Sequence, residues 1–254
     1  MKKLLAGSCV VVLALLAGAV AQAQNFRGLY VGGNLGGALG RFNATTTTVF
    51  SPTGYFAMTS PPAIATAGAL KLDPNGFNGG GGGGYNFQSG NFVLGFEVDF
   101  GSMKLNQTKA GGAPYPCCPT TSFLVVQSAK TDWIFTARPR AGIVRGRTLV
   151  YGTAGLAMTN LTYASVFTDT FASALEFGGV KETRTGWAAG GGMEIQFAHH
   201  LSFKGEYLYA DFGKGTNVST NLTAPATTSW PQNPFTNTAS PHAHLVRSGI
   251  NIRF

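Results

Sequence analysis

The stretch from Gly186 to Gly213 alternates between apolar and polar residues over two long segments, which are joined by a short turn at His199-His200. One face of these segments carries Trp187, Ala189, Met193, Ile195 and Phe197, followed by Leu201, Phe203, Tyr207 and Tyr209. The opposite face carries Glu194, Gln196, Ser202, Lys204 and Glu206. Successive side chains of a β-strand point to opposite sides, so this period of two predicts strands rather than helices. Long strands with one aromatic face and one charged face predict a transmembrane β-barrel whose apolar side faces lipid.

The N-terminal segment predicts an exported protein. Lys2 and Lys3 precede an apolar run, and Ala21 and Ala23 fit the small-residue pattern at which signal peptides are cleaved. We therefore expect residues 1–23 to be a signal peptide and residues 24–254 to form one barrel domain. A retained membrane helix is the alternative. A lipoprotein signal is rejected because Cys9 precedes most of the apolar run.

The composition favours a membrane barrel over a soluble domain. Charged residues make up only 11% of the chain, against about 25% in ordinary soluble domains. No segment after the signal has the roughly twenty unbroken apolar residues of a membrane-spanning helix. The net charge is +8, or +6 without Lys2 and Lys3, and the remaining basic residues are scattered singly. This scatter argues against nucleic-acid binding and indicates attraction to anionic lipid head groups.

Alternation along the rest of the chain predicts eight strands, with tight turns at 88–91, 145–147 and 199–200 and long loops at 43–74, 105–130, 164–182 and 214–241. Every tight turn falls at one end of the strands and every long loop at the other, as in bacterial outer-membrane barrels. The fold class is therefore expected to be all-β, an eight-stranded antiparallel up-and-down transmembrane barrel. A soluble eight-stranded barrel is the alternative, and alternation does not settle the facing of the strand at 148–163.

Nine charged side chains would face the lumen if the aromatic face is outside: Glu97, Asp99, Arg138, Arg140, Glu194, Lys204, Glu206, Arg247 and Arg253. The interior of an eight-stranded barrel is just wide enough for side chains to fill it, and an unpaired buried charge costs several kcal/mol. We therefore expect an ion-pair network that closes the lumen. A narrow aqueous path lined by the same charges and a catalytic carboxylate pair are the alternatives.

Other residues give little support for catalysis, cofactors or metals. His244 and Ser248 share a face but lie four residues apart, on the order of 13 Å, which is too far for direct proton transfer. His242 and His244 make an incomplete metal site without a nearby third ligand. The run Gly79–Gly84 lacks the Lys-Ser/Thr of a phosphate-binding loop, and glycine in a strand marks a bend or a close approach of another segment. We expect no enzyme activity, no cofactor and no metal.

Cys117 and Cys118 are adjacent in the long loop at 105–130. Neighbouring α-carbons are about 3.8 Å apart, below the usual range for a disulfide. The pair is therefore expected to be an exposed loop dithiol that is open to intermolecular pairing.

The run GWAAGGGMEIQFAHHLSFKGEYLYADFG resembles the penultimate hairpin of small alphaproteobacterial outer-membrane β-barrel proteins, the opacity-protein-like or "porin family" group with an OmpA-like transmembrane barrel. The end of the chain, with Arg247, Gly249, Ile252 and Phe254, is similar to the barrel-assembly signal of such proteins. The resemblance covers essentially the whole mature chain. It implies insertion by the barrel-assembly machinery, with recognition of the last strand, and it implies no catalysis. No peptidoglycan-binding domain is expected after Phe254.

These features predict a structural protein of the outer membrane of a Gram-negative bacterium, with both termini in the periplasm and four long loops outside. Outer-membrane lipid and lipopolysaccharide are its expected partners. The alternatives are a narrow nonspecific porin for small ions or solutes and a surface adhesin, whose loop partner the sequence does not identify.

Overall fold

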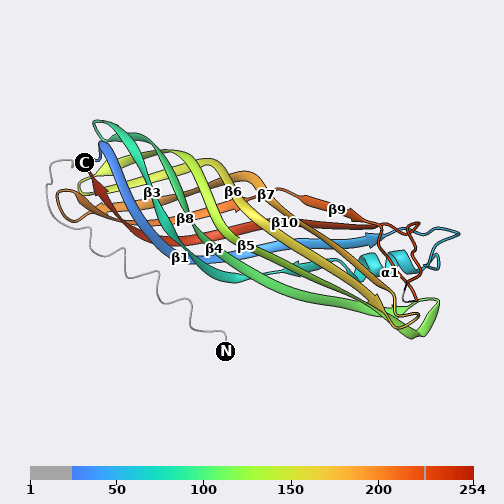
Figure 1. Cartoon of the computed structure of the whole chain (residues 1–254). Helices are drawn as coiled ribbons and strands as arrows, with labels where there is room; N and C mark the ends of the chain where they lie inside the picture. Colours follow the sequence, from blue (N-terminus) through green and yellow to red (C-terminus); the bar gives the residue numbers. More distant parts are fainter. Residues whose placement is uncertain (1–24, 226) are drawn as a thin grey trace, which may run out of the picture.

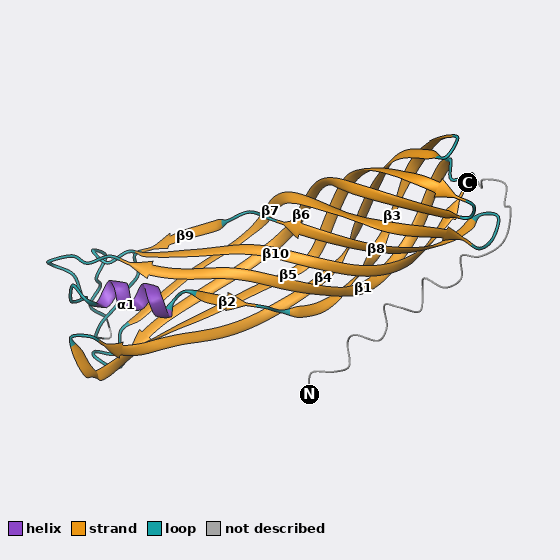
Figure 2. Cartoon of the chain, turned by 180° about the vertical axis from the view of Figure 1, so that it is seen from behind, coloured by secondary structure: helices purple, strands orange, loops and turns teal. Residues whose placement is uncertain are grey.

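The computed structural model describes residues 25–225 and 227–254, so the predicted cleavage residues Ala21 and Ala23 lie outside the described residues. Long strands form a closed antiparallel ring (Figures 1 and 2). In chain order they are β1 (Gly28–Thr48), β3 (Asn75–Ser89), β4 (Phe92–Tyr115), β5 (Cys118–Arg145), β6 (Thr148–Asp169), β7 (Leu175–Gln196), β8 (Leu201–Asp211) and β10 (Phe235–Arg253). The ring closes where β1 pairs with β10. The predicted eight-stranded antiparallel barrel is confirmed.

Three short elements lie toward the other end of the barrel from the C-terminus (Figures 1 and 2). They are α1 (Ser60–Ala67), β2 (Leu70–Leu72), which pairs with β1, and β9 (Gly215–Ser219), which pairs with β10. Proline in the first turn of α1 is tolerated because the backbone N–H groups there have no partner within the helix. Within residues 25–225 and 227–254, no helix is long and apolar enough to cross a membrane.

The three predicted tight turns are present, and all lie at the end that holds the C-terminus (Figure 1). Gly90 and Gly146 occupy the first position of two-residue turns between β3 and β4 and between β5 and β6, with φ of 59° and 57°. Two-residue hairpin turns favour residues that tolerate positive φ, so glycine suits both places. Residues 197–200 connect β7 to β8.

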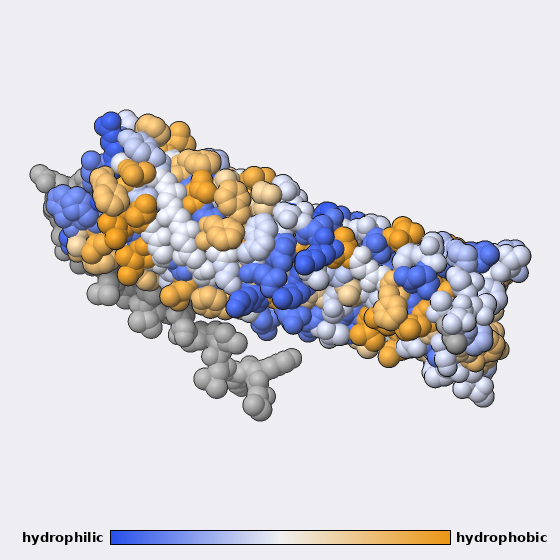
Figure 3. All heavy atoms as spheres, viewed as in Figure 1, coloured by the Kyte–Doolittle hydropathy of each residue, from blue (hydrophilic) through white to orange (hydrophobic). Residues whose placement is uncertain are grey.

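The outer surface has an apolar band next to these turns. On β1, the outward row from Leu29 to Leu39 is apolar, with Leu35 64% exposed, and it then changes to Arg41 and Asn43. Ten residues along a strand rise about 33 Å, and a tilt of about 45° reduces this to roughly 24 Å, the height of the apolar band of a membrane barrel. Figure 3 shows this apolar surface on the turn end, followed by a hydrophilic band.

The prediction of four long loops is wrong for most of their residues. β1 continues to Thr48, and β4 and β5 run through 105–130 to meet at the two-residue turn Pro116-Cys117. β6 and β7 cover most of 164–182, and β10 begins at Phe235 within 214–241. Alternation is weak in these segments because Thr, Ala, Gly and Pro supply much of both faces. The strands therefore extend well beyond the apolar band.

Beyond the band, the strands separate into two groups, because β8 ends at Asp211 and β3 begins only at Asn75. One group contains β9, β10, β1 and β2, and the other contains β4, β5, β6 and β7. Side chains bridge the boundary between β7 and β9: the Asn217 Oδ1 atom accepts from the Gly179 N–H at 3.3 Å. A hydrophobic core fills the space between the groups, and α1 and the residues after β9 contribute to it. We call it the second core, because it is separate from the apolar residues inside the barrel lumen. Its members are Phe56, Ile64, Tyr115, Phe123, Val125, Phe167, Ala174, Leu222, Ala224 and Phe235.

Glycines on the lumen side leave room for large inward side chains. A Cβ atom at Gly84 would lie 2.4 Å from the Tyr30 hydroxyl and 2.2 Å from the Phe96 carbonyl oxygen. A Cβ atom at Gly192 would lie 2.7 Å from the Tyr151 hydroxyl. The glycine run of β3 thus permits close approach of neighbouring strands, and no helix follows it.

We expect Gly84→Ala to lower the free energy of unfolding by about 1–3 kcal/mol, because the added methyl group overpacks the lumen. Gly37→Ala is the matched control, since a Cβ atom there meets nothing within 4 Å. Urea unfolding of the refolded proteins, followed by tryptophan fluorescence, compares the two variants. Equal midpoints for Gly84→Ala, Gly37→Ala and the unmodified chain would contradict this explanation of the glycine run.

Candidate functional site

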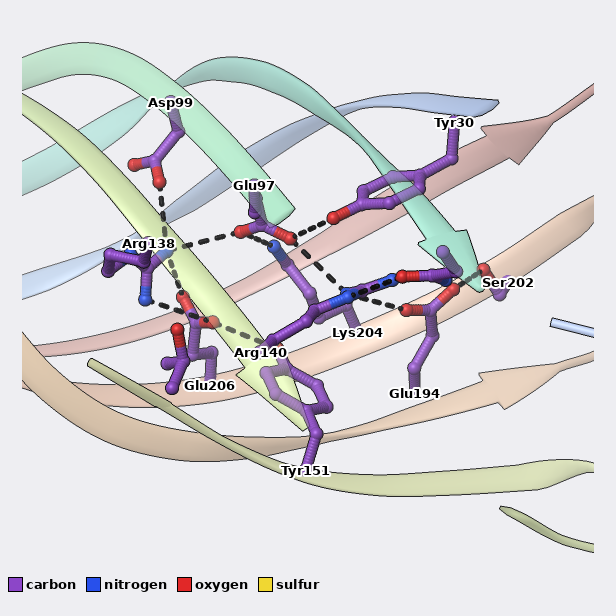
Figure 4. Close-up of polar contacts among 12 residues, drawn as sticks. Tyr30, Glu97, Asp99, Arg138, Arg140, Tyr151, Glu194, Ser202, Lys204 and Glu206 are labelled. Atoms are coloured by element: carbon purple, nitrogen blue, oxygen red, sulfur yellow. Dashed lines mark hydrogen bonds and ion pairs between the residues drawn. The ribbon is translucent and has the colours of Figure 1, made fainter. Parts of the chain in front are cut away.

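The nine charged residues expected in the lumen come together there, because strand register places opposite charges on facing positions. Glu97 of β4 pairs with Arg138 of β5, and Glu206 of β8 pairs with Arg247 of β10. Each of these side chains is in the alternating row of its strand that faces the lumen, which we call inward parity, and is almost completely buried. Figure 4 shows the network between the strands. Its charged members are Glu97, Asp99, Arg138, Arg140, Glu194, Lys204, Glu206, Arg247 and Arg253.

Arg138 is the centre of the network and has an exposed fraction of 0%. Its Nη2 atom lies 3.1 Å from Glu97 Oε1 and 2.9 Å from Asp99 Oδ2. Its Nη1 atom lies 3.4 Å from Glu206 Oε1, and its Nε atom donates to the Thr136 hydroxyl at 2.8 Å. One guanidinium group therefore holds three carboxylates from two different strands.

Arg247 binds two of the same carboxylates from the opposite side. Its Nη1 atom lies 2.7 Å from Asp99 Oδ1, and its Nη2 atom lies 2.6 Å from Glu206 Oε2. Because β10 closes the ring against β1, this side chain ties the last strand to β4 and β8 across the lumen. The two arginines and two acids form a compact group in which every charge is shared.

Closer to the turn end, Arg140 joins two carboxylates. Its Nη1 atom lies 3.3 Å from both Glu97 Oε2 and Glu194 Oε2. Arg253 Nη2 donates to Glu194 Oε1 at 2.7 Å, and Lys204 Nζ donates to Glu97 Oε1 at 2.8 Å. Arg140 Nη2 and Arg253 Nε have no hydrogen-bond partner among the described residues. The turn end of the network is therefore less complete than the part around Arg138.

Uncharged residues complete the network, and sequence reasoning did not assign them to the site. The Tyr30 hydroxyl donates to Glu97 Oε2 at 2.7 Å, and the Tyr151 hydroxyl donates to Glu206 Oε1 at 2.9 Å. Asn86 Oδ1 accepts from Arg140 Nε at 2.9 Å. Tyr30 and Asn86 have the inward parity of their strands, a signal that was available in the sequence.

The facing of β6, which alternation leaves open, is now clear. Tyr151 is 4% exposed and faces the lumen, whereas Val150 is 54% exposed and faces outward. Glycine, alanine and threonine occupy much of both faces of this strand, so the sequence contrast between the faces is small.

An apolar layer fills the lumen directly beyond the charges. On β4, Met103 and Leu105 follow Asp99, and on β10 Leu245 precedes Arg247, all with inward parity. The layer contains Ala38, Phe42, Ala44, Leu72, Met103, Leu105, Ala129, Ile134, Ala157, Leu161, Tyr163, Ala188, Leu208, Ala210, Phe212, Ala239, Ala243 and Leu245. Beside Tyr30 and Lys204, the charged layer has a cavity of about 10 Å³, about the space that one water molecule needs.

The histidines lie outside the lumen. His244 Nδ1 is 2.7 Å from the Tyr207 hydroxyl, and His242 Nδ1 is 3.1 Å from the Tyr209 hydroxyl. Asp211 Oδ2 lies 3.5 Å from His242 Nδ1, so the expectation that this histidine has no carboxylate neighbour is wrong. Within the described residues, no group of three or more His, Cys, Asp or Glu is placed to hold a metal ion.

Cys117 and Cys118 occupy the tip of the β4–β5 hairpin rather than a long loop. Both are free thiols, Cys117 is exposed, and the two Sγ atoms lie 2.8 Å apart. The position at an exposed turn makes the pair accessible to thiol reagents.

Glu176 is a buried acid outside the apolar band, and no basic side chain of the described residues pairs with it. The Ser219 hydroxyl donates to its Oε1 atom, whereas its Oε2 atom has no partner among the described residues. Burial raises the pKa of the Glu176 carboxyl above its ordinary value, because desolvation disfavours the charged form.

The folded state therefore holds the Glu176 proton more tightly than the unfolded chain, and stability falls as pH rises through the folded-state pKa. We expect Glu176→Gln to raise the free energy of unfolding by about 1–3 kcal/mol above pH 7, because the amide stays neutral. The difference should disappear near pH 4, where the carboxyl is protonated in both states. Urea unfolding at both pH values checks this, and a constant difference across pH would contradict it.

Three residues of the predicted assembly signal lie on β10, and Phe254 directly follows this strand. Arg247 points into the charged network, whereas Ile252 is 44% and Phe254 70% exposed. Gly249 pairs with Asn34 on β1, and the Phe254 N–H donates to the Leu29 carbonyl oxygen at 2.9 Å. The strand that carries this pattern is thus the one that closes the ring.

Comparison with known proteins agrees with this architecture. The family model described as "Outer membrane protein beta-barrel domain" matches residues 8–230. The "31 kDa outer-membrane immunogenic protein" of Brucella melitensis is 32% identical over 232 residues, which cover 91% of this chain and 84% of that protein. The "22 kDa outer membrane protein" of Rhizobium leguminosarum is 28% identical over 129 residues, 51% of this chain and 49% of that protein.

Among solved structures, the outer membrane protein OprG from Pseudomonas aeruginosa is similar over 91% of this chain and 99% of that chain, with a TM-score of 0.47 and 10% sequence identity. Membership rests on the family match and on the Brucella relative, and it agrees with the predicted resemblance to alphaproteobacterial barrels. This chain belongs to the outer membrane protein beta-barrel domain family.

Proposed function

We propose that this protein is a structural barrel of the outer membrane whose lumen is closed and whose strand extensions are displayed outside the cell. The charged network carries this proposal. In a water-filled channel, lumenal charges are hydrated, but here each of the four carboxylates contacts at least two cationic side chains. Every carboxylate is thus neutralised by protein groups rather than by water, so the network favours a plug over a path.

The apolar layer supports the same function independently. Phe42, Leu72 and Met103 are each at most 1% exposed and lie on β1, β2 and β4 around the lumen. An ion would lose its hydration shell in crossing this layer, and the layer offers few polar groups to replace that shell. Two barriers of different chemistry therefore follow each other along the barrel axis.

We also propose that the tight turns and the C-terminus lie in the periplasm and that the extended strands lie outside. Short periplasmic turns and longer extracellular connections are the rule in bacterial outer-membrane barrels. Export through the predicted signal peptide at residues 1–23 belongs to the same proposal. The alternative role as an adhesin would use the same displayed end.

Planar-bilayer recording of the refolded protein tests the closed lumen against the alternative of a narrow porin. We expect no reproducible single-channel steps, with insertion verified by heat-modifiable migration on gels and by protease protection in vesicles. Liposome swelling with small sugars should likewise match protein-free vesicles. Reproducible steps from the inserted protein would overturn the plug and establish the porin.

The last strand supports a second proposal, that barrel-assembly machinery recognises Arg247, Gly249, Ile252 and Phe254. We expect Phe254→Ser to reduce the assembled fraction several-fold in a reconstituted assembly reaction, because the exposed terminal ring is lost. Spontaneous refolding into detergent, which needs no machinery, should change little. Val246→Ser, at an exposed outward position of β10, is the control. Equal effects of both substitutions would contradict a specific signal.

A further inference from the structure

A cluster of basic side chains lies on the outer surface where the apolar band ends. We call it the basic cluster; it consists of Arg41, Lys71, Lys104 and Lys130 on outward rows, of Lys109, which is in the inward row of β4 but has a side chain that is 39% exposed, and of Asp73 and Asp132. These residues come from β1, β2, β4 and β5 and from the connection between β2 and β3. In the view of Figure 3, a hydrophilic band separates the apolar half from the loop end.

Local contacts join the members of the cluster. Asp73 lies 3.8 Å from the Nε atom of Arg41 and 3.6 Å from the Nζ atom of Lys109. Lys109 Nζ also donates to the Lys71 carbonyl oxygen. The ring has no continuous strand beside β1 at this point, because β2 ends at Leu72 and β3 begins at Asn75. The interruption therefore brings basic side chains of β1 and β4 to one acid, beside the backbone of β2.

Lys104 and Lys130 extend the cluster to β5. Lys130 Nζ lies 3.0 Å from Asp132 Oδ1. Hydrogen bonds from Lys130 and Asn160, together with the positive charges of Lys130 and Lys104, lower the pKa of the Asp132 carboxyl. Lys71 and Lys104 have no carboxylate oxygen within 4.0 Å of their amino groups in the part of the chain that the structure describes. Five basic groups thus face two acids, and at least two amino groups are available to an external anion.

The position of the basic cluster along the barrel axis, just beyond the apolar band, indicates which partner it can contact. On the outward row of β1, Arg41 follows Leu39 by two residues, which is about 7 Å along the strand and roughly 5 Å along the axis of a tilted barrel. On β4, Lys104 follows the exposed Phe100 by four residues. Side chains at this height meet the head-group layer rather than the acyl chains or the bulk solvent. The anions concentrated in that layer are lipid phosphates.

We propose that the basic cluster binds the phosphate groups of lipopolysaccharide in the outer leaflet. The proposal rests on the orientation given above, because only the outward-facing end meets that lipid. Arg41 supplies a planar fork of donors that matches two phosphate oxygens, and the lysines supply mobile point charges. Phosphate binding would fix lipid against the side of the barrel formed by β1, β2, β4 and β5, at the base of the displayed strands.

Binding of bisphosphorylated lipid A to the refolded protein in nanodiscs tests the proposal. The triple variant Arg41→Gln/Lys71→Gln/Lys104→Gln should weaken binding by about a hundredfold, since each of the three basic residues near an anionic surface contributes about 1 kcal/mol. The matched control is Arg27→Gln/Arg145→Gln/Arg147→Gln, which removes three exposed positive charges at the turn end. The control should change the affinity by less than about twofold.

Two further binding measurements identify the ligand. Dephosphorylated lipid A should bind the unmodified protein about tenfold more weakly, and inorganic phosphate at millimolar concentration should not compete. Equal weakening by both triple variants would show attraction to net charge alone and overturn the site. Competition by inorganic phosphate would overturn the lipid assignment. Protease cleavage of the extended strands on intact cells tests the orientation separately, so failure there is distinguishable from failure of phosphate binding.

Discussion

Replacing Arg138 with alanine is expected to lower the free energy of unfolding by about 3–5 kcal/mol, the usual cost of removing one partner from a buried ion pair. The loss leaves Glu97, Asp99 and Glu206 with one cation fewer in a lumen where Arg138 is completely buried. Arg247 still contacts Asp99 and Glu206, so the effect should stay finite rather than abolish folding. Urea unfolding of the protein in lipid vesicles measures it.

Arg145→Ala is the control for this experiment, because Arg145 is exposed at the tight turn after the same strand. We expect Arg145→Ala to change the free energy of unfolding by less than about 0.5 kcal/mol. Arg138→Lys should recover part of the stability, since it restores the charge but not the forked geometry. An unchanged urea midpoint for Arg138→Ala would show that the carboxylates are hydrated, and it would count against the plug.

Replacing Phe167 with alanine is expected to loosen the extended end of the barrel while the membrane band stays folded. Phe167 is fully buried and its ring contacts those of Phe56, Phe123 and Phe235 at centroid distances of 5.6, 6.1 and 5.1 Å. Removing such a ring costs about 3–5 kcal/mol. If this loss lowers the free energy of local opening at the extended end, protease cleavage within residues 160–180 should accelerate by roughly a hundredfold or more.

Phe171→Ala serves as the control, because Phe171 is 58% exposed at the β6–β7 connection. Its effect on cleavage should be small. The global urea midpoint of Phe167→Ala should change much less than its cleavage rate. If cleavage of Phe167→Ala matched that of the unmodified protein, the second core would not be what orders the strand extensions.

The prediction of long loops and the observed strand extensions differ for a physical reason. In the membrane band, lipid demands large apolar residues on the outer row, so β4 alternates sharply between Phe96 and Glu97. Above the band, water accepts small polar residues on the outer row, and inward positions hold a mixture such as Leu105 and Gln107. The contrast between faces fades although the backbone pairing continues. Periodicity therefore locates the membrane band, not the ends of the strands.

The candidate site was predictable residue by residue but not as an arrangement. Parity along each strand assigned Glu97, Arg138 and Arg247 to the same side, because the alternation of side chains is a local property of extended backbone. The alternation along one strand carries no information about distances to other strands. It could therefore not show that the guanidinium group of Arg138 contacts three acids. It also missed Tyr151, on a strand whose two faces are alike in composition.

The sequence by itself determined the class of fold, the ring of eight strands, the tight turns at one end and the charged lumen. Each of these follows from a pattern within one segment and from the rule that lipid and lumen face opposite sides of a strand. Only the tertiary structure decided how far the strands extend, which charges contact each other, and that an apolar layer follows the charges. Those features depend on the register between strands and on closure of β1 against β10, which couple residues too distant in the chain for any local pattern to relate.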